Sequence, residues 1–328
     1  MRNPEGIAAA LKKAQKIAIC CHINPDGDTI GSGLAMRLIL QGMGKQATVF
    51  CQDKAPDNLF FLPGVGEIRT PEQAEPAYDL MLSVDVSTPE RMGSCWEVIR
   101  PRCAATAQLD HHGTNPLFME VNSVDGNACA TCVMIWRQMQ AMDLEMTRDI
   151  AMCLYTGIST DTGNFSFSCT DTEAFEAMAD LMRSGIPLTD MNFFLFREKS
   201  RPQLALLGRA IASLRFLGPK QDLAVMTLTL ADFDACHAKN EHADTIVNYA
   251  LETVGTRMAM LGREDLYAPG MIKFSLRAVA PLQVDGIAER LGGGGHAQAA
   301  GISMAGTLDD CVARVAAEME KVLAENPG

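Results

Sequence analysis

Residues 17–40 read IAICCHINPDGDTIGSGLAMRLIL, and this stretch decides the fold. Residues 17–21 form a short apolar run that predicts a buried strand, whereas residues 29–40 are apolar at helical spacing. The segment between them, HINPDGD (22–28), is polar and contains the Pro and Gly typical of a turn. A strand, a polar loop and a helix in this order indicate one unit of an α/β sheet.

The same alternation continues along the first half of the chain. We expect further strands at 47–51, 80–84 and 104–109, and helices at 4–15, 130–142, 147–157 and 171–184. This pattern predicts an α/β fold with a doubly wound, mostly parallel sheet. Ligands bind such sheets at the carboxyl ends of the strands, so the residues that follow each strand should be those that carry the chemistry.

A length of 328 residues is sufficient for two domains, because single cores rarely grow beyond ~250–300 residues. We expect a first domain at 1–185, a partly helical linker at 186–220, and a smaller α/β C-terminal domain at 221–328. The linker prediction includes a mainly helical stretch at 189–217. In the second domain the patterns predict strands at 223–230, 257–261, 271–279 and 301–304, and helices at 231–239, 245–253, 284–291 and 308–325. We expect the active-site cleft to lie between the two domains.

Composition restricts the partners and the compartment. The formal net charge of −12 argues against a long basic track for duplex nucleic acid, although a small phosphate can still bind through cations. No apolar run is long enough to predict a membrane span, and the N-terminus has no signal-type apolar core, so we expect the chain to be mature from its first residue. The 11 scattered cysteines favour reduced thiols and a cytoplasmic location over a cysteine zinc site.

Four polar clusters follow the predicted elements of the first domain. They are HINPDGD (22–28), Asp85 at the end of LMLSVD, the run Asp110-His111-His112-Gly113, and the run Thr160-Asp161-Thr162-Gly163. Carboxylates and imidazoles together suit Mn²⁺, Fe or Zn²⁺ better than Ca²⁺ or Mg²⁺. Asp26 and Asp28 lie two residues apart in a turn and can point at one site, and Asp85 is the candidate for a carboxylate that bridges two ions.

Each cluster also has a structural interpretation. Asp26 and Asp28 could form a turn and a helix cap, Asp85 could cap a strand end, and Asp161 could belong to a turn. The adjacent His111 and His112 are harder to explain by packing. The joint occurrence of all four clusters favours a metal site.

Together these motifs identify a family resemblance. HINPDGD, LMLSVD, LDHHG and STDTGNF in this order, followed by GGGGHAQAAG (292–301), resemble the DHH phosphoesterase superfamily with its DHH-associated C-terminal domain. The resemblance covers nearly the whole chain. It implies two divalent ions, Mn²⁺, with His22 and Asp26 on the first and Asp85 bridging. The second ion would take Asp28, His111 and Asp161.

The resemblance also implies roles outside the metal ligands. His112 would face the scissile phosphate, and Asp110 would orient a histidine by a hydrogen bond. In the second domain, Arg277 and the loop residues Gly293, Gly294, Gly295 and His296 would hold the substrate. A helix C-cap followed by a flexible loop is the alternative for the glycine run, and an exposed strand arginine is the alternative for Arg277.

Within the superfamily, the chain resembles the bacterial oligoribonucleases that also act on 3'-phosphoadenosine 5'-phosphate. This resemblance implies hydrolysis of short oligoribonucleotides to nucleoside monophosphates, removal of the 3'-phosphate, or both, by in-line attack of hydroxide on phosphorus. The alternatives are a linear or cyclic di-AMP phosphodiesterase, an exopolyphosphatase or pyrophosphatase, and a non-catalytic nucleotide-binding module. The sequence leaves open which substrate is preferred and whether the chain forms a homodimer.

Overall fold

The computed structural model describes residues 2–327, except for the side chain of His296, and divides the chain into two units. The first unit extends to Glu198 and the second begins at Lys199. The stretch 186–220, which we expected to connect two domains, is therefore shared between them. Each unit is described by itself below.

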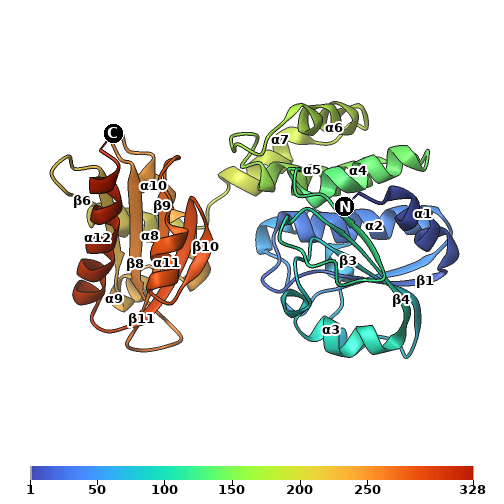
Figure 1. The fold of residues 1–328 in the computed structure, drawn as a ribbon, viewed down its shortest axis with the longest axis horizontal. Coiled ribbons are helices and arrows are strands. Elements are labelled where there is room, and N and C mark those ends of the chain that lie inside the picture. Colours follow the sequence, from blue (N-terminus) through green and yellow to red (C-terminus); the bar gives the residue numbers. More distant parts are fainter. Residues whose placement is uncertain (1, 328) are drawn as a thin grey trace. The chain divides into compact units, whose positions relative to one another are not determined.

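The first unit contains the parallel sheet that the sequence predicts. Its strands are β1 (Lys16–Cys20), β2 (Gln46–Phe50), β3 (Tyr78–Val84), β4 (Cys103–Asp110) and β5 (Val121–Val124). They lie in the order β2-β1-β3-β4-β5, and all pairs are parallel. Strands β1, β3 and β4 are labelled in Figure 1. The doubly wound fold class is confirmed. The short strand β5 was not predicted, because its four residues VNSV have no clear apolar alternation.

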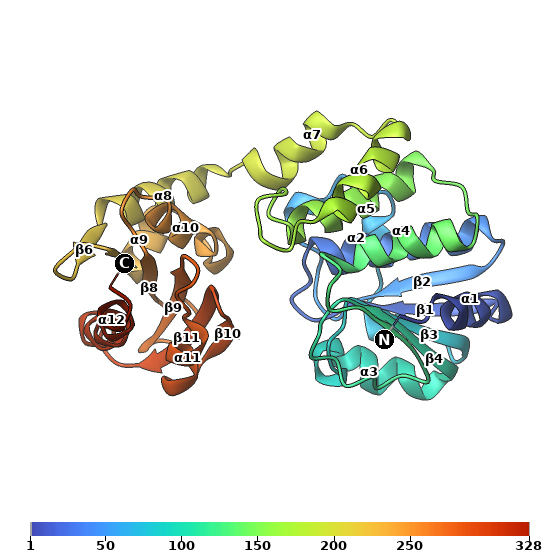
Figure 2. The ribbon, with the colours of Figure 1, turned by 45° about the horizontal axis from the view of Figure 1, so that its top comes forward.

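Helices cover both faces of this sheet (Figure 2). The helices of this unit are α1 (Pro4–Lys13), α2 (Gly27–Gly42), α3 (Ser94–Ile99), α4 (Thr131–Ala141), α5 (Arg148–Asp161), α6 (Thr172–Arg183) and α7 (Leu188–Asn192). Of these, α6 packs on α4 and α5 and not on the sheet (Figure 2). Alternate residues of the strands point to opposite faces. Ile17 and Ile19 belong to the core beneath α2, α4 and α5, whereas Ala18 and Cys20 pack with residues of α3 on the other face.

The strand order determines where a ligand can bind. From β1 the sheet continues with β2 on one side and with β3 on the other, so β1 and β3 flank the point at which the strand order reverses. Ligands of open α/β sheets bind outside the carboxyl ends of the strands at this point. His22 follows β1 and Asp85 follows β3 directly, so both lie there.

The second unit has a mixed sheet. Its strands are β6 (Arg215–Leu217), β7 (Leu223–Leu228), β8 (Met258–Glu264), β9 (Met271–Ala278), β10 (Gly294–His296) and β11 (Ala299–Ala305). The order is β10-β11-β9-β8-β7-β6, and only β7 and β8 are parallel. Its helices are α8 (Arg201–Ala212), α9 (Leu230–Ala235), α10 (Ile246–Leu251), α11 (Asp285–Arg290) and α12 (Leu308–Glu325).

The predicted helical stretch 189–217 is interrupted in the structure. Helix α7 and the π-helix η6 (Phe193–Arg197) end before Ser200, whose side chain accepts a hydrogen bond from the Gln203 N–H at the start of α8. Pro202 in the first turn of α8 favours a new helix start over a continuous helix. The last three residues of the stretch form β6, which pairs with β7.

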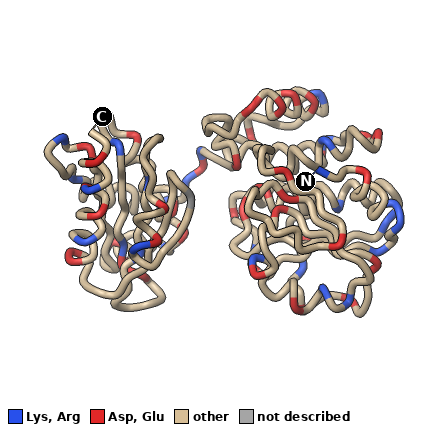
Figure 3. Tube along the Cα trace, viewed as in Figure 1, with Lys and Arg blue, Asp and Glu red and all other residues tan. Residues whose placement is uncertain are grey.

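Each unit has its own hydrophobic core. In the second unit, residues of α11 and α12 pack on one face of the sheet and residues of α8, α9 and α10 on the other. Along the described chain, no helix is long and apolar enough to cross a membrane. Acidic and basic positions are interspersed over both units in the view of Figure 3.

Candidate metal centre

Two histidines present the same ring nitrogen to the site. His22, after β1, and His111, after β4, each place Nδ1 next to a backbone carbonyl, that of Ile23 at 2.8 Å and that of Ala128 at 3.2 Å. A carbonyl oxygen only accepts hydrogen bonds, so Nδ1 carries the proton in both rings. Nε2 of both rings is then left with its lone pair directed at the carboxylates, which is the arrangement of a metal-ligating histidine.

Asp85 lies between these two histidines. Its Oδ2 is 3.5 Å from Nε2 of His22, and its Oδ1 is 3.4 Å from Nε2 of His111. The carboxylate is buried and accepts a hydrogen bond from the Thr131 hydroxyl at 3.1 Å. Each oxygen of one carboxylate therefore faces a different imidazole, as a carboxylate shared by two ions would.

The remaining carboxylates form one group on each side of Asp85. Asp26 Oδ1 is 3.6 Å from Nε2 of His22, and Asp161 Oδ2 is 3.3 Å from Nε2 of His111. Asp28 belongs to the second group, and potential ligand atoms within each group lie within 4.8 Å of one another. These three aspartates reach the site from the ends of two helices: Asp26 caps α2, Asp28 lies in the first turn of α2, and Asp161 ends α5.

Asp28 also contacts the start of α4. Its two oxygens accept hydrogen bonds from the backbone N–H groups of Thr131 at 2.6 Å and Cys132 at 3.0 Å. Each carboxylate oxygen has a second lone pair, so these bonds fix the carboxylate without excluding an ion. The position of Asp28 is thereby determined by the helix dipole as well as by the turn.

The pKa values of the clustered groups are shifted by burial and by one another. Burial, and then the nearby carboxylate of Asp85, raise the pKa of Asp28 to about 7. Burial and Asp28 also raise the pKa of Asp161 well above its usual range. Burial alone would lower the pKa of His22, but its interactions with Asp26 and Asp85 outweigh burial and raise it to about 10. The shifts arise because buried carboxylates crowd one another around the imidazoles, and a divalent cation held by these groups would offset that crowding of negative charge.

The donor set fits divalent ions. The His–Asp distances of 3.3–3.6 Å exceed those of good hydrogen bonds. Two ligand atoms that are each ~2.1 Å from one ion lie ~3–3.5 Å apart, which is close to these values. In the described part of the chain, the ion pairs of Asp26, Asp85 and Asp161 involve only histidines. This centre is a metal site by its ligand chemistry.

His112 has a different environment. Its Nδ1 donates to Asp110 Oδ1 at 2.7 Å, and the other oxygen of Asp110 accepts from the Asn115 amide at 2.6 Å. Nδ1 is also 3.8 Å from Asp85, but ligation through this atom would break the bond to Asp110. Asp110 is fully buried and its hydrogen bond raises the pKa of the partly exposed His112. The structure thus holds the His112 ring in one orientation at the edge of the metal cluster.

Several contributors were missed by sequence reasoning. Thr131 contacts both Asp85 and Asp28, Asn115 holds Asp110, and the Thr29 hydroxyl donates to the carbonyl of Val84 at 3.1 Å. Thr131 had one available signal, because a predicted helix begins beside it and helix starts favour acidic neighbours. For Thr29 no signal exists without the fold, since strand order brings Val84 beside it. Asn115 lies only five residues after Asp110, but their contact depends on the turn after β4, which no motif predicted.

The substrate residues predicted in the second unit lie in one region of its sheet. Arg277 on β9 pairs with Ala299 on β11, which in turn pairs with His296 on β10. The Arg277 side chain is partly buried, its Nε donates to Asn248 at 3.2 Å, and burial lowers its pKa. The side chain of His296 lies outside the described part of the structure.

The glycine run has its own backbone requirements. The Gly293 N–H donates to the carbonyl of Ala288 at 2.7 Å, and Gly292 has φ of 80°, as in a helix C-cap. A Cβ at Gly295 would lie 2.5 Å from the carbonyl oxygen of Ala299. Gly294 has open space at its Cβ position. The helix C-cap therefore explains the glycine at the start of the run, Gly292. The pairing of β10 with β11 explains why Gly295, at its end, lies so close to Ala299.

Comparisons with known proteins agree with this geometry. The model of the DHH family N-terminal domain matches residues 16–158, and the model of the DHHA1 domain matches residues 224–325. A bifunctional oligoribonuclease and PAP phosphatase, NrnA, of Thermus thermophilus is 31% identical over 94% of this chain and 91% of its own length. The chain belongs to the DHH family. The resemblance drawn from the motifs is confirmed.

Further relatives of this DHH protein extend over the same length. NrnA of Bacillus subtilis is 23% identical over 93% of this chain and 94% of its own length. An exopolyphosphatase-related protein of Bacteroides fragilis has the same fold, with a TM-score of 0.89 at 24% identity over 98% of this chain and 95% of its own. As a DHH phosphoesterase, the chain is a metal-dependent hydrolase of phosphate esters.

Proposed function

We propose that this chain hydrolyses short oligoribonucleotides to nucleoside monophosphates and removes the 3'-phosphate of 3'-phosphoadenosine 5'-phosphate, using two Mn²⁺ ions. The observation that carries the proposal is the position of Asp85, whose two carboxylate oxygens each face a different histidine. The Thermus and Bacillus relatives, which align over nearly the whole chain, support the choice of substrates. A cytoplasmic location is part of the same proposal, since the described cysteines are all free thiols.

The ligand groups divide between the two ions. His22 and Asp26 would hold the first ion, Asp28, His111 and Asp161 the second, and Asp85 both. When bound, the ions bring water to a pKa near neutrality and offset the charge of the phosphoryl oxygens. The mixed imidazole and carboxylate set supports Mn²⁺ over Mg²⁺, which prefers oxygen ligands and retains several waters.

Side chains other than the metal ligands contact the reacting phosphate and hold the substrate. His112 has Nδ1 held by Asp110, so its Nε2 can contact a phosphoryl oxygen or give a proton to the leaving oxygen. Arg277 presents a guanidinium whose planar shape suits a phosphate. We assign Arg277, His296 and the glycine run Gly293–Gly295 to holding the part of the substrate that does not react.

The test is a substrate panel with purified protein and Mn²⁺. Short oligoribonucleotides, 3'-phosphoadenosine 5'-phosphate, linear and cyclic di-AMP, pyrophosphate and polyphosphate are compared by kcat/KM. Nucleoside monophosphates from short RNA, together with release of the 3'-phosphate, support the proposal. A preference for di-AMP species or release of orthophosphate from phosphoanhydrides would replace it by one of those activities. Nucleotide binding without turnover would indicate a non-catalytic module.

A further inference from the structure

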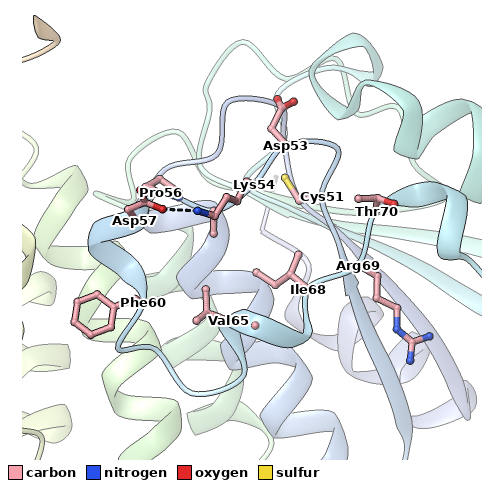
Figure 4. Close-up of a pocket in the computed structure, with 12 residues that line it drawn as sticks. Cys51, Asp53, Lys54, Pro56, Asp57, Phe60, Val65, Ile68, Arg69 and Thr70 are labelled. Carbon is pink, nitrogen blue, oxygen red and sulfur yellow. Dashed lines mark hydrogen bonds and ion pairs between the residues drawn. The ribbon is translucent and has the colours of Figure 1, made fainter. Parts of the chain in front are cut away.

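A second candidate binding site lies beyond the end of β2. It is a cavity of about 400 Å³ in the first unit, bordered by the loop that runs from Cys51 to Thr70 (Figure 4). This volume falls within the ~300–1,000 Å³ of typical small-molecule sites. The residues assigned above to the metals and to substrate binding do not line it, so it is a distinct feature of the first unit.

The cavity adjoins the loop that carries the first metal ligands. Two of its lining residues contact that loop directly: the Cys51 thiol donates to the carbonyl of His22 at 3.3 Å, and Asp53 accepts from the Asn24 N–H at 2.7 Å. Since β1 and β2 are parallel neighbours, Cys51 and His22 leave the sheet at the same edge. The cavity and the first metal ligands are therefore borne by segments in direct contact.

The cavity is held open by the sheet and by α2. The Arg69 N–H donates to the carbonyl of Val49 at 2.9 Å, and the Cys51 N–H donates to that of Arg69 at 3.0 Å, which pairs the far side of the loop with β2. Arg37 on α2 bonds the carbonyl of Gly64 and the carboxylate of Glu67. The two sides of the cavity are therefore fixed before any ligand arrives, which reduces the entropic cost of binding.

The lining combines an apolar interior with a polar rim of both signs. Cys51, Val65 and Ile68 are apolar, whereas Asp53 and the Lys54–Asp57 ion pair lie on the rim. In Figure 4, Lys54, Ile68 and Val65 lie between Asp53 at one end and Phe60 at the other. An isolated phosphate would require an excess of positive charge, which a lining with charges of both signs does not offer. A purely apolar ligand would displace water from the charged rim groups without replacing it by polar contacts. A planar ring with donors and acceptors on its edge fits this lining, because its faces can contact the apolar interior while its edge contacts the polar rim.

Phe60 supplies an aromatic surface at this site. Its side chain is 59% exposed although its ring packs edge-on against Phe194 at 5.0 Å between centroids. An exposed aromatic ring that is supported from behind is a typical surface for stacking a nucleobase.

We propose that this cavity binds the nucleobase of the nucleotide next to the scissile phosphate, with the base stacked on Phe60 and its polar edge facing Asp53 and Lys54. The proposal rests on the proposed function, because it requires a nucleotide phosphate at the metal cluster. It makes the first unit a determinant of substrate length and base content.

The test compares a dinucleotide with two abasic analogues, each lacking one of the two bases. With wild-type protein and Mn²⁺, we expect kcat/KM for the dinucleotide to exceed that for one analogue by about 5- to 150-fold, the range of base stacking on an aromatic side chain. Phe60→Ala should bring this ratio close to 1. Phe193→Ala is the matched control, because Phe193 is 46% exposed and contacts Phe194 but does not line the cavity; its ratio should equal that of the wild type.

A second variant fills the cavity instead of removing the ring. Gly66 lines it, and a Cβ at this position would meet no atom within 4 Å, so Gly66→Leu introduces a side chain without a clash at Cβ. It should also bring the ratio close to 1. Ratios that stay at the wild-type value in both variants would overturn the proposal for the cavity. Failure of the wild type to hydrolyse any dinucleotide would instead overturn the proposed function.

Discussion

At Asp85 the backbone enters the left-handed region, with φ of 59°. This conformation is unfavourable by about 1–2 kcal/mol for an L-residue and is tolerated best by Asn and Asp. In return, the carboxylate is directed between His22 and His111. The backbone strain and the burial of a carboxylate whose charged neighbours are all histidines are both understandable if the residue holds cations.

Replacement of Asp85 by Asn should remove metal and activity together. Asn keeps the shape and the tolerance of positive φ but loses the charge that two ions would share. We expect Mn²⁺ content, measured by mass spectrometry of the metal, to fall for both ions, and kcat/KM to fall by more than the ~10–100-fold typical of residues behind the ligands. The control is Asp143→Asn, an exposed aspartate with φ of 53° outside the site. Full Mn²⁺ content in Asp85→Asn would contradict the bridging role.

Asp110→Asn should separate positioning from metal binding. Asp110 holds His112 through Nδ1, so its loss frees the ring to rotate or change tautomer. We expect kcat to fall ~10–100-fold while Mn²⁺ content stays at the wild-type level. Loss of Mn²⁺ in this variant would place Asp110 or His112 among the ligands instead.

At the scale of elements, the packing of α2 against α5 brings the second ligand group together. Asp28 lies in the first turn of α2 and Asp161 in the last turn of α5. Gly31, one turn after Asp28, lies where a Cβ would be 2.5 Å from the carbonyl oxygen of Cys153 on α5. The absence of a side chain at Gly31 therefore determines how closely the two ligands approach.

Gly31→Ala should destabilise the first unit although Ala is the better helix former. Overpacking costs about 1–3 kcal/mol, which exceeds the propensity gain of at most ~1 kcal/mol. Chemical denaturation measures the change, and Mn²⁺ affinity should weaken in parallel. Gly42→Ala, in the same helix with no atom within 4 Å of the new Cβ, should be neutral or slightly stabilising. Equal effects of the two substitutions would argue against this packing constraint.

At the scale of the whole molecule, the two units have separate cores, so they can respond separately to metal. The core residues of the first unit all precede Glu198, and those of the second all follow Lys199. The metal ligands lie only in the first unit. Binding of Mn²⁺ to the folded state should stabilise that unit by mass action.

Calorimetry of the full chain should therefore show one Mn²⁺-dependent transition. At free Mn²⁺ about 100 times its Kd, the stabilisation is ~2.7 kcal/mol, and EDTA should reverse it. The transition of the second unit should not move, and Asp85→Asn should abolish the shift. A shift of both transitions by the same amount would show that the units unfold as one.

Arg277→Ala tests whether the second unit binds substrate while the first unit alone binds the metals. Loss of a hydrogen bond to a charged group costs about 1.5–3 kcal/mol, so we expect kcat/KM for the nucleotide substrate to fall ~10–150-fold with Mn²⁺ content unchanged. Arg314→Ala, an exposed arginine on α12, is the matched control. A loss of Mn²⁺ from Arg277→Ala would contradict the assignment of the metals to the first unit alone.

Much of the fold could be predicted because the elements near the site have strong local patterns. The apolar run before His22 and the helical spacing after Asp28 indicate β1 and α2 without reference to the rest of the chain. The strands β5, β6 and β10 have no such pattern. They are short, polar or rich in glycine, and they exist because a neighbouring strand provides hydrogen-bond partners.

The sequence by itself determined the alternation of strands and helices and the chemical types at the strand ends, because periodicity and side-chain chemistry are local properties. Only the tertiary structure decided that Asp85 lies between His22 and His111, that α4 contacts Asp28, and that a cavity lies beside the His22 loop. These relations depend on the parallel order β2-β1-β3-β4-β5, which brings segments distant in sequence to one edge of a sheet.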